Sequence, residues 1–190
     1  PAVRGSCSDL GLKPATYSGT VEIDSGTVTI HTDVAGSASR MGHRLVIAVD
    51  DWSASVEMRA KKPVAVQFRA ALASLRVESG SGGITPLTPV DRQVIVRNAT
   101  KTLDVKRHPE VTFRSSEMAT AAGRVDVVGE LTIHGVTQPL TATLALADGR
   151  VTASIPVRQT DFEVKPYSLM FGQLKVADEV VVDLDVQIPG

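Results

Sequence analysis

The sequence predicts an all-β protein: an extended antiparallel β-barrel of about eight strands, with one helix between strands. Apolar and polar residues alternate with a period of two along most of the chain, which is the pattern of half-buried strands. Valine and threonine, which favour strands, are common, and aromatic residues make up only 4% of the sequence. Alternation continues to the last residues, so we expect the final strand to pair within the sheet. Closure of the first strand on the last would remove both sheet edges.

The length of 190 residues fits a single domain. We place a flexible arm at residues 1–14, which are small, polar and glycine-containing, and a barrel domain at residues 15–190. Cys7 is the one cysteine, which rules out an intrachain disulfide, and we expect it to be an inert thiol. No apolar run is long enough for a membrane-spanning helix, and the first residues lack the hydrophobic core of a signal peptide. We therefore expect a cytoplasmic protein.

The strands are predicted from rows of alternating residues. The row at 45–49 places its apolar residues on odd positions, and the row at 52–58 places them on even positions. A bulge or tight bend near Asp50 and Asp51, with both carboxylates exposed, would keep the two rows facing the same side. The complete set of predicted strands covers residues 20–24, 28–34, 45–49, 52–58, 64–68, 72–77, 111–115, 125–133, 140–146, 151–157 and 180–188.

A hairpin at residues 124–146 carries the longest alternation. Gly129 falls on its apolar face, where a missing side chain suits a bend or bulge. The chain turns at Gly135, and His134 sits in that turn. This histidine could contact the polar head of a ligand, but we favour an imidazole that hydrogen bonds nearby backbone and fixes the turn.

One substantial helix is expected to begin at Thr88. Thr88 can cap it, Pro89 fits the first helical position, and Asp91 suits the positive end of the helix dipole. We expect Pro109 to stop this helix. Its expected apolar stripe consists of Val90, Val94, Ala99 and Leu103.

No pattern of catalytic or metal-ligating residues is found in the sequence. The four histidines, which are His31, His43, His108 and His134, show no short metal-binding spacing, so we expect no metal and no cofactor. The G-x-S-x-G elbow of serine hydrolases is missing too, and we expect no enzyme activity. Lysine plus arginine number 20 against 21 aspartate plus glutamate, which gives no broad positive field for nucleic acid.

Several short motifs occur in the same order as in a known protein family. The segment ELTIHGVTQP (residues 130–139) closely resembles the G-x-L-T-x-H-G-V-T-x-P signature of the YceI-like family. RHPEVTFRSS (107–116), TDF (160–162) and DEV (178–180) are similar to segments that flank this signature in the same family. GHRLVIAVDDWSA (42–54) and KPYSLMFGQLKVADEV (165–180) resemble a bacterial branch without a signal peptide.

The resemblance implies a lipocalin-like barrel that binds a polyisoprenoid or another amphiphile in its lumen. The leading hypothesis is a non-enzymatic carrier or sequestering protein for such a small molecule. A packed barrel that serves as an interaction or stress-related module is the alternative, and a lipid-modifying enzyme is a weaker third reading. The sequence is compatible with a homodimer and does not decide it.

Candidate ligand-binding residues follow from the alternation and from one amphipathic segment. We expect the segment from Lys165 to Lys175 to cover one barrel end, with its lysines near an acidic head group. The alternative is a solvated turn whose Met and Phe plug the core. Alternation places Leu131, Ile133, Leu144, Ile155, Val182 and Leu184 inside the barrel. The full candidate set is Leu45, Ile47, Val127, Leu131, Ile133, Leu144, Ile155, Phe162, Lys165, Tyr167, Phe171 and Lys175.

Overall fold

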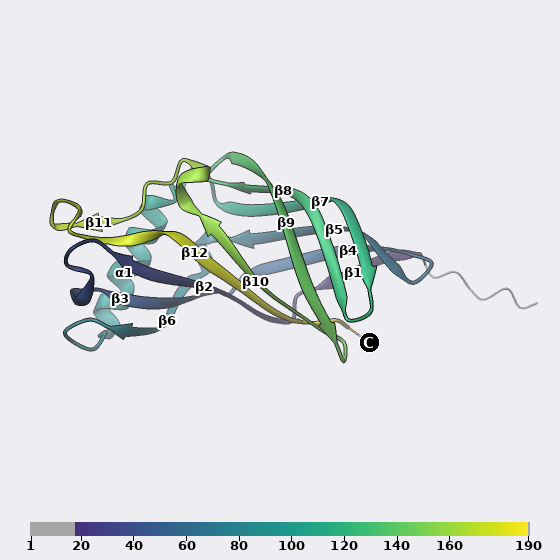
Figure 1. The fold of residues 1–190 in the computed structure, drawn as a ribbon, viewed down its shortest axis with the longest axis horizontal. Helices are drawn as coiled ribbons and strands as arrows, with labels where there is room; N and C mark the ends of the chain where they lie inside the picture. Colours follow the sequence, from purple (N-terminus) through teal and green to yellow (C-terminus); the bar gives the residue numbers. More distant parts are fainter. Residues whose placement is uncertain (1–17, 190) are drawn as a thin grey trace, which may run out of the picture.

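A computed structural model describes residues 18–189, so the predicted arm at 1–14 and Cys7 lie outside the described residues. One curled antiparallel sheet of twelve strands and one α-helix make up the fold (Figure 1). The elements are β1 (Gly19–Ile23), β2 (Gly26–Ala35), β3 (His43–Val49), β4 (Trp52–Arg59), β5 (Lys62–Ala71), β6 (Leu75–Gly82), α1 (Pro89–Thr102), β7 (Glu110–Ala121), β8 (Arg124–Ile133), β9 (Val136–Ala147), β10 (Arg150–Arg158), β11 (Ser168–Leu169) and β12 (Leu174–Gln187).

The sheet closes because three long strands are bent. The hydrogen-bonded order is β1-β4-β5-β7-β8-β9-β10-β12-β2-β3-β6, with β11 paired only to β12. The chain runs from β1 into β2, from β3 into β4, and from β5 into β6, so the first three strands of this order are continuous with the last three. Counting each bent pair as one strand, and leaving the two-residue β11 aside, gives eight long strands. The predicted barrel of about eight strands is confirmed.

The bend between β3 and β4 lies at Asp50 and Asp51, as predicted. Both carboxylates are exposed and form ion pairs: Arg76 Nε lies 2.8 Å from Asp50 Oδ2, and Arg69 Nη2 lies 3.1 Å from Asp51 Oδ1. The hydrogen bond from Arg76 lowers the pKa of Asp50 below its usual value. These aspartates therefore tie neighbouring strands together at a corner.

Gly129 is required by a bulge, but the bulge lies on the neighbouring strand. The register between β7 and β8 shifts between Ser115 and Glu117, and Gly129 pairs with Ser115. A Cβ atom at Gly129 would lie 2.3 Å from the Arg114 carbonyl oxygen and 2.7 Å from the Phe113 ring. Glycine is needed here because the bulged backbone of β7 approaches too closely for a side chain.

Helix α1 begins as predicted and ends earlier. Thr88 and Asp91 form a reciprocal capping box, with Pro89 in the first turn. The helix ends at Thr102, well before Pro109, and Asp104 follows with a left-handed φ of 44°. The predicted stripe was wrong at its first two positions, since Val90 and Val94 are 67% and 41% exposed. The inward face instead includes Ile95, Ala99 and Leu103, which are spaced four residues apart.

Helix α1 lies at one end of the barrel, near β3, β6 and β11, while the β4–β5 turn lies at the opposite end (Figure 1). Two apolar clusters fill the wall between them. The larger is centred on β2, β3, β4 and β6, and the smaller contains Leu131, Val157, Phe162 and Val164. No helix in the described part of the chain is both long enough and apolar enough to cross a membrane.

Candidate functional site

The barrel encloses a cavity of about 640 Å³. Its wall receives residues from every long strand and from α1, and most are Val, Leu, Ile and Ala. The volume lies within the range of small-molecule sites, which are typically about 300–1,000 Å³. The period-two alternation produces this wall, because each strand turns every second side chain toward the lumen.

The predicted interior residues lie where alternation places them. All six residues expected to face inward border the cavity. Nine of the twelve candidate ligand-binding residues also line it: Leu45, Ile47, Val127, Leu131, Ile133, Leu144, Ile155, Phe162 and Tyr167. The register of the sheet is therefore confirmed, and an apolar lumen is brought together from strands that are far apart in sequence.

The other three candidates, Lys165, Phe171 and Lys175, are not among the residues that line the cavity. Ser168 and Leu169 of β11 pair with Lys175 and Leu174 of β12, so the residues between them form the tip of a hairpin that projects beyond the barrel (Figure 1). Phe171 lies in that tip with a φ of 56° and is fully exposed. It therefore neither lines the lumen nor plugs the core.

Polar side chains are rare on the wall. Asn98 and Thr102 of α1 supply polar atoms, as do Thr32, Thr120, Gln159 and Tyr167. Among the described residues, Lys61 in the β4–β5 turn is the one charged residue on the wall. Sequence analysis missed Asn98, Thr102 and Lys61. The spacing of Asn98 and Thr102, one helical turn apart beside Ile95 and Ala99, was an available signal.

His134 does not act as predicted. Its backbone φ of 54°, followed by 79° at Gly135, makes the two-residue turn between β8 and β9. The Nδ1 atom of His134 is buried and has no hydrogen-bond partner within residues 18–189. We expected the His134 ring to hydrogen bond nearby backbone, but Nδ1 makes no such bond within these residues, and the left-handed conformation itself makes the turn.

Comparison with known proteins places the chain in a family. The YceI-like domain matches residues 8–188, so the chain belongs to the YceI-like family. Burkholderia cenocepacia BcnA has a similar crystal structure, with a TM-score of 0.62 and 22% identity over 85% of this chain and 94% of that one. The Campylobacter jejuni YceI protein gives a TM-score of 0.56 with 14% identity, over 74% and 82% of the two chains. No curated protein matches the sequence.

Proposed function

We propose that this protein binds a polyisoprenoid or another lipid in its lumen and acts as a non-enzymatic carrier or sequestering protein. The observation that carries the proposal is a cavity of about 640 Å³ whose wall is almost entirely apolar. Each methylene of a ligand chain buried there contributes about 0.8 kcal/mol. Seven of the nine candidate residues on the wall would contact the chain along β3, β8, β9 and β10.

The scarcity of polar groups on the wall supports binding over catalysis. General acid–base chemistry needs titratable groups within hydrogen-bond reach of one another. Among residues 18–189, Lys61 and Tyr167 are the titratable residues that line the cavity. Lys61 lies in the β4–β5 turn and Tyr167 directly precedes β11, and these two elements lie at opposite ends of the barrel (Figure 1). Lys61 would meet an acidic head group in this proposal, the role expected from the sequence for Lys165 and Lys175.

A matched pair of tryptophan substitutions on β9 tests the proposal. Ala142 lines the cavity, whereas Ala145 is exposed on the outer face of the same strand. Ala142→Trp fills the lumen, so we expect it to abolish binding of a fluorescent isoprenoid probe, measured by titration. Ala145→Trp adds the same indole outside and should bind the probe like the unaltered protein. Equal binding by both variants would contradict a ligand site in the lumen.

Native mass spectrometry of gently purified protein provides a second test. A stoichiometric isoprenoid-like species supports the carrier, and its repeated absence favours an interaction module. One observation favours that second function: Leu169, Met170 and Phe171 are 48%, 48% and 109% exposed at one hairpin tip. Contiguous apolar residues on a surface often mark a contact site. Truncation of this tip would then abolish partner binding and leave probe binding unchanged.

A further inference from the structure

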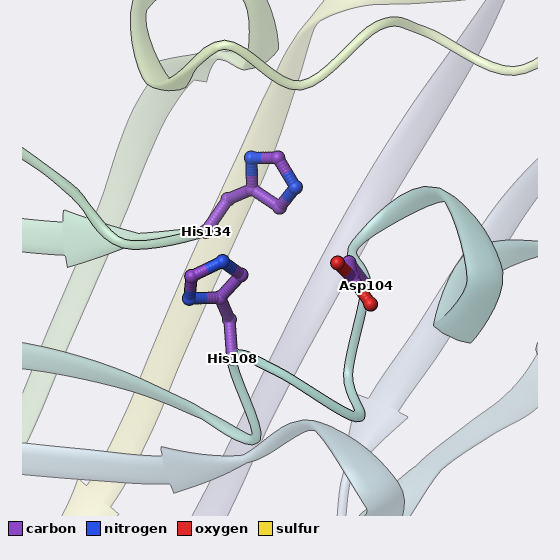
Figure 2. Close-up of side chains that lie close together, drawn as sticks. All are labelled: Asp104, His108 and His134. Carbon is purple, nitrogen blue, oxygen red and sulfur yellow. The ribbon is translucent and has the colours of Figure 1, made fainter.

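Three side chains with metal-ligand chemistry converge outside the lumen wall. Asp104 follows α1, His108 precedes β7, and His134 lies in the β8–β9 turn (Figure 2). One ligand atom from each residue lies within 4.8 Å of the other two. This cluster could not be predicted from the sequence, because the two histidines are 26 positions apart and no short spacing joins them.

Backbone hydrogen bonds hold the first two residues together. The N–H groups of Arg107 and His108 both donate to the Asp104 carbonyl oxygen, at 2.9 Å each. This turn after the helix brings His108 back beside Asp104. The Asp104 carboxylate is only loosely paired, since Arg107 Nη1 lies 3.6 Å from Oδ2 and the Arg107 side chain is 78% exposed. The carboxylate is therefore not committed to a strong ion pair.

His134, the third residue of the cluster, lies in a turn that packs closely against the His108 ring. The His108 ring lies over Gly135, where a Cβ atom would be 2.6 Å from Cε1 of His108. The His108 and His134 rings are 5.0 Å apart between centroids and tilted by 60°. Figure 2 shows the His134 ring above the His108 ring, with Asp104 beside them on the segment that follows α1.

The cluster contains an unsatisfied polar atom. Nδ1 of His134 is buried and lacks a hydrogen-bond partner among residues 18–189. A buried polar atom without a partner is rare in folded proteins, so the hydrogen bonds of the fold do not account for the His134 ring. Asparagine and glycine also tolerate this left-handed position, so the turn itself does not require an imidazole.

We propose that Asp104, His108 and His134 form a binding site for a divalent cation of the zinc type. Two imidazole nitrogens and one carboxylate oxygen are ligands that zinc prefers, whereas calcium and magnesium prefer oxygen alone. Tetrahedral zinc at its usual bond lengths places ligand atoms about 3.4 Å apart, so modest side-chain rotation closes the site. The fourth position stays open for water or an anionic ligand. This site does not depend on lipid binding in the lumen.

Calorimetric titration of the protein with zinc chloride tests this site. All proteins carry Cys7→Ser, since a free thiol also binds zinc. We expect one equivalent to bind, and we expect Asp104→Asn and His134→Asn each to weaken binding by about 100-fold. Asparagine at 134 tolerates the left-handed turn, so that variant should keep the fold, which circular dichroism checks. Cobalt provides an independent readout, because a tetrahedral site gives intense visible absorption.

The remaining histidines supply matched controls. His31 contacts Asp183, and His43 Nε2 lies 2.7 Å from the Thr85 carbonyl oxygen. His31→Gln and His43→Gln should bind zinc like the Cys7→Ser parent. Absence of saturable binding in the parent would overturn the proposal, as would equal affinity in the parent and both cluster variants. If His134→Asn fails to fold, the isosteric Asp104→Asn decides alone.

Discussion

Phe162 and Phe171 lie nine residues apart in the same β10–β12 connection, and both occur in short 3₁₀ turns. Phe162 is 5% exposed, borders the cavity, and packs in the cluster with Leu131, Val157 and Val164. Phe171 is fully exposed at a hairpin tip. The same aromatic side chain therefore has opposite environments in two turns of similar length.

The difference lies in what ties each turn to the barrel. Around Phe162, the Gln138 side chain donates to the Asp161 carbonyl, and the Gln159 side chain donates to the Ala177 carbonyl, both at 2.9 Å. Thr160 donates to the Asp178 carboxylate through its N–H and its hydroxyl. The turn of Phe171 instead extends the β11–β12 pairing outward. Anchoring to neighbouring strands, rather than local apolar content, decides which aromatic ring is buried.

The largest expected effect is the loss of stability when the Phe162 ring is removed, with removal of the Phe171 ring as the comparison. Phe162→Ala should lower the free energy of unfolding by about 3–5 kcal/mol, because it leaves a hole in a packed cluster. Phe171→Ala should change it by less than about 0.5 kcal/mol, since its ring contributes nothing to the core. Urea unfolding followed by circular dichroism measures both. A large loss in Phe171→Ala would mean that the hairpin tip packs against the protein in solution.

A smaller difference in stability is expected between a leucine that only borders the cavity and a leucine that is also packed in an apolar cluster. Leu144 is half-buried and borders the cavity, whereas Leu131 borders it and also packs within the Phe162 cluster. Leu144→Ala should cost about 1 kcal/mol, and Leu131→Ala about 2–5 kcal/mol, because only the second removes tightly packed contacts. The same urea titration compares them. Equal large losses would indicate that the lumen is filled at Leu144.

The smallest effect concerns the anchor of the Phe162 turn and depends on pH. Hydrogen bonds from the Thr160 side chain and backbone lower the pKa of Asp178 below its usual value of 3.8. A carboxyl whose pKa is lower in the folded state stabilises the fold above pH 3.8, and this contribution disappears as the pH falls toward the folded-state pKa.

Asp178→Asn cannot titrate, so its melting temperature should fall less than that of the unaltered protein between neutral and strongly acidic pH. The partly exposed position of this carboxylate keeps the difference well below the cost of either leucine truncation. Thr160→Val should reproduce part of the effect by removing the hydroxyl donor. Parallel acid profiles for all three proteins would show that Asp178 does not anchor the turn.

The sequence by itself determined the local features of this protein. Alternation predicted the strands and the inward register, including Leu144 and Ile155, because side-chain direction in a strand follows from sequence position alone. Thr88 and Asp91 predicted the helix start, because a capping box forms within one turn. The motifs around residues 130–139 by themselves indicated the YceI-like family.

Only the tertiary structure decided which residues that are distant in sequence come into contact. The open lumen depends on the volume left when eight long strands close, and alternation does not specify that volume. Phe171 is exposed because β11 pairs outward with β12, a pairing that its local apolar sequence does not reveal. His108 and His134 meet because the β8–β9 turn lies beside the segment that follows α1. Such long-range contacts are set by closure and register, which no short stretch of sequence encodes.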